Sequence, residues 1–317
     1  MPENSQPSFA GIEVALKTLR GVLISPGGET VNRSESNYEA DDLIKAVSEL
    51  TRELQKSGDI KSVGLAIPGL VNRETDRVLV STNLPFTARE HLHSDLMAAT
   101  GLHFELENDA NAAAYGEYKA GAGRNARDIF YIGIGDAIGG ALILNGKLWT
   151  GASGCAGEIG HITIDTEGAE CACGNTGCLE TIASGPNIVR RARERLNRDN
   201  TSSLSRLAMQ ASFTAADLAL EATNGDDFSV MMLERTGRSI GIAVASVINL
   251  LGIERIILGG AVMEAGDLLL NPMINEARSR SLPQCFDATQ VVAAELGVEG
   301  VAIGAALLAR DALANPT

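Results

Sequence analysis

The sequence predicts an α/β protein with two layered domains, and three observations lead to this prediction. The chain has 317 residues, more than one hydrophobic core usually serves. Apolar runs typical of buried strands alternate with segments of helical spacing, the pattern of sheets covered by helices. A new pair of strands after residue 128 resembles the opening of a second, similar sheet.

The elements of the first half follow from the spacing of apolar residues, which alternate in strands and recur every three to four positions in helices. In chain order we expect two strands within 9–24 that continue toward 29–31, a helix at 40–57, a buried strand at 62–71 that ends at Pro68-Gly69, a helix at about 87–99 and a strand at 102–106.

The second half is predicted in the same way, with Pro186 after Ser184 as a helix start. Gly237, Gly241 and Ala245 are spaced four apart, which predicts close helix packing there. In order we expect strands at 128–135 and 139–148, a helix from Pro186, a long helix at 228–251, a strand at 254–260 and an amphipathic helix at 300–313.

Composition and charge exclude several classes of function. The chain is 45% hydrophobic and 21% charged, as in ordinary soluble proteins, and its net charge is −14. Nucleic-acid binding needs clustered Lys and Arg, so we expect no nucleic-acid partner. The N-terminus has no signal-peptide pattern, and no run reaches the roughly 18 apolar residues of a membrane helix. We therefore expect a cytoplasmic protein with reduced thiols and no membrane partner.

Three of the five cysteines lie within 171–178 and suggest a metal site. Zn²⁺ prefers four tetrahedral N or S ligands, and the Cys171-x-Cys173 pair supplies two of them from one turn. Cys178 follows as a third, and His161 is the nearest candidate for the fourth. Four protein ligands leave no open position for water, so the pattern favours a structural zinc over a catalytic zinc or free or redox thiols.

The remaining residues of this segment have simpler expected roles. Gly174 and Gly177 allow the backbone to fold back over an ion without Cβ clashes. Cys155 is the odd thiol, and we expect it to be a small buried residue rather than a ligand.

The segment GHITI followed by CACGNTGCLE resembles the signature of the ROK family (repressors, open reading frames and sugar kinases). The resemblance continues in order through AIPGLV, STNLPF, ENDANAAAYGE, ILNGKLWTGASGCAGEIGH, ILGGAV and AIGAALLA. It implies an actin-like ATPase (ribonuclease H-like) fold, with sugar and ATP in a cleft between two α/β domains. We expect these domains to comprise 1–118 with about 300–317, and 119–299.

On the sugar side, the resemblance implies that Asp109 is the catalytic base toward the sugar 6-hydroxyl. A base must be a carboxylate or similar group within hydrogen-bond reach of that proton, although Asp and Asn are also preferred at helix N-caps. The other implied sugar contacts are Gly69, Asn83, Asn108, Glu158, His161 and Glu180. Without the resemblance, Glu158 and Glu180 would be interpreted as surface charges, and Asn83 and Gly69 as turn residues.

On the nucleotide side, this chain departs from the family pattern. An Asp-x-Gly-Gly-Thr-type turn is replaced by residues 13–18, in which Ala15 and Leu16 stand for the glycines. In the second phosphate loop, 135–141, Asp136 places a negative charge where a polyanion should bind. Lys17 either pairs with Asp136 or contacts phosphate. The implied nucleotide-binding residues are Glu13, Lys17, Thr18, Gly135, Asp136, Gly139, Gly140, Gly259 and Gly260.

Three functions follow as hypotheses. The first is a kinase that uses ATP with Mg²⁺ to phosphorylate the 6-hydroxyl of a hexose, glucose-like or an N-acetylhexosamine, as bacterial members of the family do. The second is a family member that binds sugar as a sensor or regulator without phosphorylating it. The third, a DNA-binding repressor, is disfavoured because only about ten residues precede the first strand. The resemblance favours the kinase and implies a homo-oligomer, a dimer or tetramer.

Overall fold

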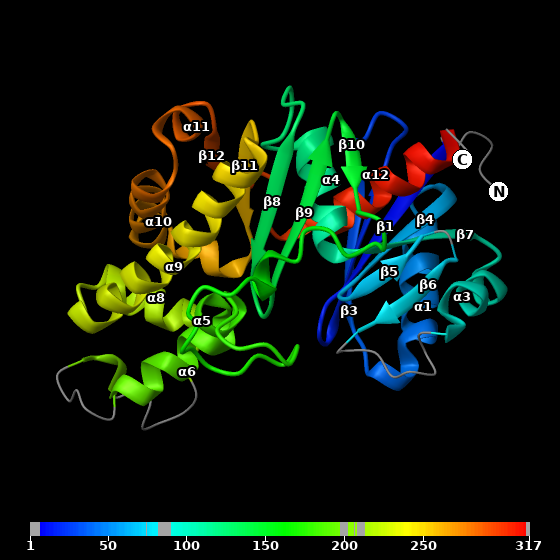
Figure 1. Ribbon diagram of the computed structural model, residues 1–317. Coiled ribbons are helices and arrows are strands. Elements are labelled where there is room, and N and C mark those ends of the chain that lie inside the picture. The colour runs from blue at the N-terminus through cyan, green and yellow to red at the C-terminus, as the bar shows by residue number, and fades with distance from the viewer. Residues whose placement is uncertain are drawn as a thin grey trace. The chain divides into compact units, whose positions relative to one another are not determined.

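The computed structural model describes residues 7–73, 75–81, 90–196, 202–205, 207 and 213–314. The chain forms two compact α/β units (Figure 1). The first comprises Met1–Asn125, Ala141–Ala156 and Glu295–Thr317, and the second comprises Ala126–Gly140 and Gly157–Ala294. Within the described ranges, none of the helices has the length and apolar character needed to cross a membrane.

The sheet of the first unit has the strand order β3-β2-β1-β4-β7. β1, β2 and β3 run antiparallel, whereas β1, β4 and β7 are mutually parallel neighbours. A small antiparallel pair, β5 (Leu70–Asn72) and β6 (Arg77–Val80), follows β4. The five strands are β1 (Pro7–Val14), β2 (Thr18–Ile24), β3 (Thr30–Asn37), β4 (Asp59–Ile67) and β7 (His103–Asn108).

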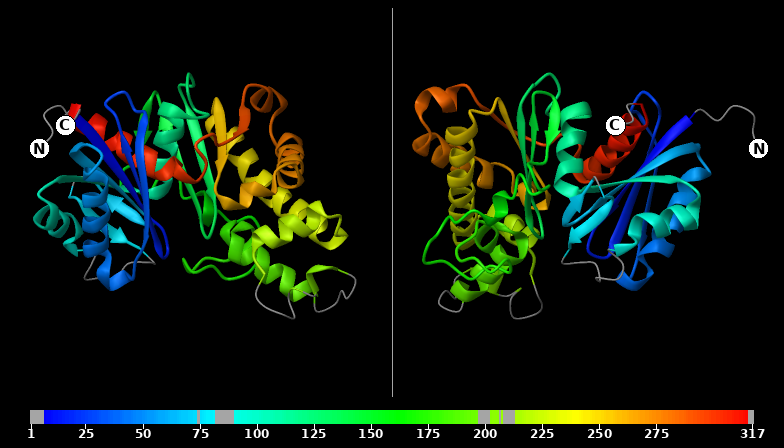
Figure 2. Two further views of the ribbon diagram at one scale, coloured as in Figure 1. Left: turned by 180° about the vertical axis from the view of Figure 1, so that it is seen from behind. Right: turned by 45° about the vertical axis from the view of Figure 1, so that its right-hand side comes forward.

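Helices cover both faces of this sheet (Figure 2). Apolar residues of α1 (Leu43–Gln55), which follows a short 3₁₀ turn, and of α3 (Leu92–Thr100) form a core with one face. On the other face lie α4 (Asp109–Ala120) and α12 (Gly300–Ala314), whose apolar side chains pack against β1, β2 and β4. The alternating direction of side chains along each strand supplies both faces with apolar residues.

The expected amphipathic character of 300–313 is wrong. Residues 302–309 of α12 are buried without interruption, because this helix lies between the sheet and α4 rather than at the surface. Its small residues allow a close crossing: a Cβ on Gly304 would lie 1.7 Å from the carbonyl oxygen of Ala112 in α4. A helix that is apolar all round is a buried helix, and AIGAALLA has that composition.

The second sheet has the order β10-β9-β8-β11-β12, which places its strands in a pattern like that of the first sheet. β8 (Ile129–Ile134), β11 (Arg255–Gly259) and β12 (Gln290–Ala293) are parallel neighbours. The predicted single strand at 139–148 is wrong: it is a hairpin of β9 (Ile138–Leu144) and β10 (Lys147–Trp149). Asn145 and Gly146, both with positive φ, form its turn, which is the usual role of Asn-Gly.

The described helices of the second unit pack around α9 (Asp227–Leu251), the long helix for which the sequence predicts close packing. Its Gly237 and Gly241 lie against α10 (Asp267–Arg280), where an added Cβ would come within 2.5 Å of the carbonyl oxygens of Leu269 and Met273. The predicted close packing is therefore confirmed at both glycines. The other helices that the structure describes in this unit are α5 (Glu180–Ala183), α6 (Gly185–Leu196), α8 (Ala215–Thr223) and α11 (Pro283–Asp287), with 3₁₀ turns at Ile159–His161 and Ala261–Ala265.

Glu117 of α4 anchors two of the segments through which the chain leaves and re-enters the first unit. Its buried carboxylate accepts hydrogen bonds from the backbone N–H groups of Ala122 (2.7 Å), Glu295 (3.1 Å) and Leu296 (2.9 Å). Residues 121–125 lead out of this unit, and 295–296 lead back into it. One side chain thus holds together the first exit from this unit and the last return to it.

Replacing Glu117 with alanine is expected to lower the thermal midpoint by at least about 6 °C. The buried N–H of Ala122 and the partly buried N–H groups of Glu295 and Leu296 would lose their acceptor, at a cost of about 3 kcal/mol. Thermal unfolding followed by circular dichroism measures this. Glu117→Gln keeps one acceptor oxygen and should fall between the wild type and Glu117→Ala. An unchanged midpoint in Glu117→Ala would show that the anchor is dispensable.

Candidate functional site

The candidate residues of the first unit lie at the carboxyl ends of its parallel strands. Glu13 of β1 is in register with Ala66 of β4, and Ala66 with Glu107 of β7. The next residue of β7 is Asn108, after which α4 begins at Asp109. In open α/β sheets this edge is where ligands bind, so the fold brings these residues to a suitable place.

Asp109 is held by two hydrogen bonds to one oxygen of its carboxylate. Its Oδ1 accepts from the side-chain Nδ2 of Asn108 (3.1 Å) and from the backbone N–H of Ala110 (2.9 Å). Asn108 is the N-cap of α4, since its Oδ1 accepts from the backbone N–H of Asn111 at 3.0 Å. The N-cap role that the sequence left open therefore belongs to Asn108, and Asp109 is the first helical residue, half-buried.

Gly69 belongs to the same group, because its carbonyl oxygen accepts from Nδ2 of Asn108 at 2.9 Å. Its φ is +135°, and an added Cβ would lie 2.1 Å from the carbonyl oxygen of Val80. A glycine is required here for both reasons. Asn83, the remaining predicted sugar contact of this unit, lies outside the described residues.

Glu107 is a buried carboxylate behind Asn108 that the sequence alone does not single out. Its Oε1 accepts from the backbone N–H of Asn108 and from Nδ2 of Asn111, both at 2.9 Å. Nε of Arg73 lies 3.5 Å from its Oε2. Burial raises the pKa of Glu107, and the positive charge of Arg73 opposes this rise. In the sequence, the only sign that Glu107 belongs to the site is its position as the first residue of the motif ENDANAAAYGE.

The first candidate phosphate loop is a tight hairpin turn between β1 and β2. The N–H of Ala15 donates to the carbonyl of Thr18 at 2.9 Å, and Tyr38 contacts the loop through its N–H to Lys17 and its hydroxyl to the carbonyl of Ala15. Positive φ is absent from residues 15–18, so this turn needs no glycine. Leu16, 59% exposed, and Lys17 point their side chains outward at its tip.

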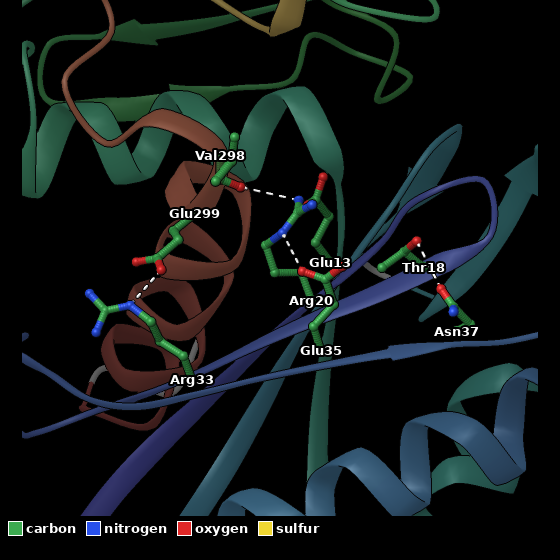
Figure 3. A network of polar contacts seen from close by, with 8 residues as sticks. All are labelled: Glu13, Thr18, Arg20, Arg33, Glu35, Asn37, Val298 and Glu299. Atoms are coloured by element: carbon green, nitrogen blue, oxygen red, sulfur yellow. Dashed lines mark hydrogen bonds and ion pairs between the residues drawn. The ribbon is translucent and has the colours of Figure 1, made fainter.

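Glu13 has a partner that only the strand register reveals. Figure 3 shows Arg20, directly opposite on β2, with one nitrogen 2.7 Å from the Glu13 carboxylate and a hydrogen bond to the carbonyl of Val298. Burial raises the pKa of Glu13, and Arg20 opposes that rise. Nearby, Thr18 reaches Asn37 at 3.5 Å. The carboxylate is thus engaged by arginine.

Burial of Glu13 and Glu107 leads to a prediction for the pH dependence of stability. Because both folded pKa values are raised above 4.5, the folded chain binds more protons than the unfolded chain just above that pH. The contribution of these groups to the unfolding free energy therefore falls as pH rises from about 4.5 through their folded pKa values. Thermal midpoints across this range should fall less steeply in Glu107→Gln than in the wild type; equal slopes would contradict this.

In the second unit, the loop 135–141 lies beside the start of α6. The N–H of Gly135 donates to the carbonyl of Ala137, and the N–H of Gly185 donates to the carbonyl of Gly135 at 2.8 Å. Asp136 is exposed at the tip. Gly139 and Gly140 are within β9. The sequence did not indicate Gly185, although a Gly-Pro pair at a helix start could have drawn attention to it.

Gly259 and Gly260 end β11 next to β8. Gly259 is in register with Gly133, and a Cβ on Gly260 would lie 2.4 Å from the carbonyl oxygen of Ile134. The carboxyl ends of β8 and β11 and the N-terminus of α6 therefore meet at one edge of the sheet. Backbone N–H groups of this kind suit a phosphate-bearing ligand.

His161, Cys171, Cys173 and Cys178 form a possible metal site, with all four ligand atoms within 4.8 Å of one another. Sγ of Cys171 lies 3.7 Å from Nδ1 of His161, and the sulfurs of Cys173 and Cys178 are 3.8 Å apart. A tetrahedral ion with Zn–S bonds of about 2.3 Å separates two sulfurs by roughly 3.8 Å. The arrangement fits zinc.

The loop around the cysteines is held in place by its own backbone. The N–H of Cys171 donates to the carbonyl of Asn175, and the N–H of Gly177 to the carbonyl of Ala169, both at 2.8 Å. Gly177 has φ +71°, and a Cβ there would overlap the carbonyl oxygen of Asp165 at 1.5 Å. Burial raises the pKa of Cys178 to about 12, whereas a bound cation would favour its thiolate.

The expectation that Cys155 is buried is wrong. Cys155 is exposed, because it lies in the small-residue segment after β10, where the described residues provide no core to cover it. Its sulfur is 3.6 Å from the carbonyl oxygen of Ser153. It stands apart from the four possible ligands.

Glu158, His161 and Glu180 form the candidate sugar contacts of the second unit. Burial raises the pKa of Glu158, His161 opposes the rise and Glu180 adds to it, so their charges act on one another. Oε2 of Glu180 accepts from the backbone N–H of Ile138 at 2.9 Å. Glu180, at the start of α5, thereby connects the cysteine loop to the loop 135–141.

Comparison with known proteins adds a family to this geometry. The sequence model of the ROK family matches residues 10–312. A glucokinase of Halalkalibacterium halodurans is 32% identical, over 96% of this chain and 95% of its own. The DNA-binding transcriptional repressor Mlc of Escherichia coli is 28% identical over 96% of this chain and 74% of its own.

A solved structure confirms the fold. The ROK family glucokinase from Streptomyces griseus, in complex with glucose and AMPPNP, superposes with a TM-score of 0.86 at 29% identity, over 96% of this chain and 99% of that one. The chain therefore has the actin-like ATPase fold that the sequence predicts.

Proposed function

The chain belongs to the ROK family, and from this premise we propose that it is a sugar kinase that transfers the γ-phosphoryl group of ATP to the 6-hydroxyl of a hexose. The observation that carries the proposal is the placement of Asp109. Its carboxylate is oriented by Asn108 and Ala110 at the carboxyl edge of parallel strands, where a base for a sugar hydroxyl is required.

Asp109 accepts the proton of the 6-hydroxyl in this proposal. Asn108, whose amide is fixed by the carbonyl of Gly69, keeps the carboxylate in one orientation, and Asn83 is a further sugar contact. The carboxylates of Glu158 and Glu180 accept hydrogen bonds from the other hydroxyls, which His161 also contacts. A site built on such bonds rejects analogues that lack a hydroxyl, because its polar groups would be left unpaired.

The phosphoryl donor is assigned to the glycine-rich edge of the second unit and to the hairpin of the first. Gly135, Asp136, Gly139, Gly140, Gly259 and Gly260 approach the nucleotide, with the N-terminus of α6 beside Gly135. Glu13, Lys17 and Thr18 are placed near the phosphates, with Lys17 in contact with them. Mg²⁺, when bound with ATP, neutralises the charge of the phosphates.

The four ligands His161, Cys171, Cys173 and Cys178 hold a structural zinc in this proposal. The bound ion closes the cysteine loop and leaves no position for water. Glu180 begins α5 two residues after Cys178, and His161 would contact both ion and sugar. The zinc loop therefore positions sugar contacts and takes no part in phosphoryl transfer.

Glucose is the sugar we propose to test first, because relatives such as the enzyme of Halalkalibacterium halodurans are glucokinases. Cytoplasmic location and a homo-oligomer stay predictions. The absence of a nucleic-acid partner also stays a prediction, because the relative Mlc is a DNA-binding repressor.

The decisive experiment measures ADP release with ATP, Mg²⁺ and a panel of hexoses and N-acetylhexosamines, together with thermal shifts by each sugar and nucleotide. We expect glucose-dependent ADP release. Stabilisation by a sugar without turnover, and without a response to any nucleotide, would contradict the kinase.

A second candidate, a sugar-binding regulator without kinase activity, is favoured by the state of the first phosphate loop. This loop presents Ala15 and Leu16 in place of the two glycines, and Arg20 engages Glu13. Such a protein would be stabilised against thermal unfolding by a sugar but would release no ADP. Fluorescence anisotropy with duplex DNA, with and without glucose, would then test a repressor-like partner; we expect no DNA binding in either case.

A further inference from the structure

We propose that Glu107 is a positioning residue for Asp109 and that Arg73 is the counter-ion of Glu107. This inference rests on the proposed function, since it assigns a role around the same carboxylate. Glu107 touches no reacting atom in this proposal and acts through Asn108 and Asn111.

A continuous set of hydrogen bonds joins the two carboxylates. Oε1 of Glu107 holds the backbone of Asn108 and the buried amide of Asn111, both at 2.9 Å. Asn111 in turn donates its backbone N–H to Oδ1 of Asn108, and Asn108 donates Nδ2 to Oδ1 of Asp109. The last strand residue and the first turn of α4 are therefore fixed from behind by one side chain.

Glu107 is a costly residue for a merely structural position. It is only 3% exposed, and among the described residues its Oε2 has no hydrogen-bond partner, although Nε of Arg73 lies 3.5 Å away. Its in-register neighbour on β4 is Ala66, so an apolar residue would suit this layer. A buried charge that is incompletely satisfied destabilises a protein, which indicates that the charge has another use.

The charge has a direct effect on a neighbouring base. A negative group behind Asp109 disfavours a second ionised carboxylate and raises its affinity for a proton. The charged groups that act on Glu107 are Arg73, which favours its ionised form, and Glu105, which opposes it, while burial raises its pKa. From α4, the group that contacts Glu107 is the amide of Asn111, and the backbone N–H of Asn108 contacts it at the end of β7.

The first test compares Glu107→Gln with Glu107→Ala. Glutamine keeps an acceptor for Asn108 and Asn111 but removes the charge, whereas alanine removes both. We expect kcat to fall roughly tenfold in Glu107→Gln and roughly a hundredfold in Glu107→Ala, with the sugar KM changed by less than about twofold. A change in KM alone, or the same kcat in the wild type, Glu107→Gln and Glu107→Ala, would overturn the proposal.

The pH profile separates positioning from simple loss of structure. In this proposal the negative charge of Glu107 raises the affinity of Asp109 for a proton, so the acid limb of kcat/KM should move to lower pH in Glu107→Gln, which lacks that charge. In Arg73→Met the limb should move to higher pH, because the negative charge of Glu107 is then no longer offset by a nearby cation. In Glu107→Gln/Arg73→Met it should match Glu107→Gln. Limbs that coincide in all variants would overturn the proposal.

A measurement without turnover keeps this test independent of kinase activity. Carboxyl ¹³C resonances of labelled aspartate, with Asp109 assigned by its loss in Asp109→Asn, can be titrated in the wild type and in Glu107→Gln. We expect the Asp109 titration to move to lower pH in Glu107→Gln even if no sugar is phosphorylated. An unchanged titration would refute the inference, whereas absent ADP release in the wild type would refute only the kinase.

Discussion

Replacing Asp109 with asparagine is expected to reduce sugar-dependent ADP release by a factor of about 10² to 10⁴, the usual contribution of a general base. Asparagine has the same shape, and its Oδ1 can still accept from Asn108 and Ala110. It cannot accept a proton from the 6-hydroxyl. The variant should therefore fold normally, bind sugar and fail in the chemical step.

Three measurements check this result: initial rates of ADP release, the thermal midpoint, and the further stabilisation by glucose. Asp95→Asn is a matched control, because Asp95 is an exposed aspartate in the first turn of another helix, α3; it should leave all three unchanged. If Asp109→Asn retained more than half of the wild-type rate, Asp109 would not be the base. Loss of the glucose shift together with the rate would instead indicate a binding role.

Replacing Cys178 with serine is expected to remove the metal and to disorganise the loop that carries His161 and precedes Glu180. Cys178 is completely buried, and its sulfur is 3.8 Å from that of Cys173. Structural zinc sites bind with an apparent free energy of about 10–16 kcal/mol, so loss of a ligand has a large effect on the segment that the ion closes. Glucose-induced stabilisation should disappear with the metal.

Metal analysis of the purified protein provides the direct measurement, with zinc expected at about one per chain in the wild type and far less in Cys178→Ser. Cys155→Ser is the matched control, since it makes the same chemical change at an exposed thiol outside the cluster. It should keep both zinc and the glucose response. Full zinc content in Cys178→Ser, or an intact glucose response after chelation, would contradict the proposed role.

Much of the fold is predictable from sequence because its signals are local. Alternation predicts β1, β2 and β4, and helical spacing predicts α1 and α9, within a few residues of their observed ends. The two errors in the predicted elements, the single strand at 139–148 and the amphipathic helix at 300–313, have different causes. The hairpin turn at Asn145-Gly146 was readable from its residues, whereas the burial of α12 depends on α4, almost two hundred positions away.

The candidate site divides in the same manner. By itself, the sequence determined the family signature, the α/β class and the four possible metal ligands, because those ligands lie within one short segment that folds back on itself. Only the tertiary structure decided the partners of Glu13 and Glu107. Strand register places Arg20 opposite Glu13. Glu107 is buried, and the cation near its Oε2 is Arg73. Pairing and desolvation depend on neighbours distant in sequence, and no local pattern encodes them.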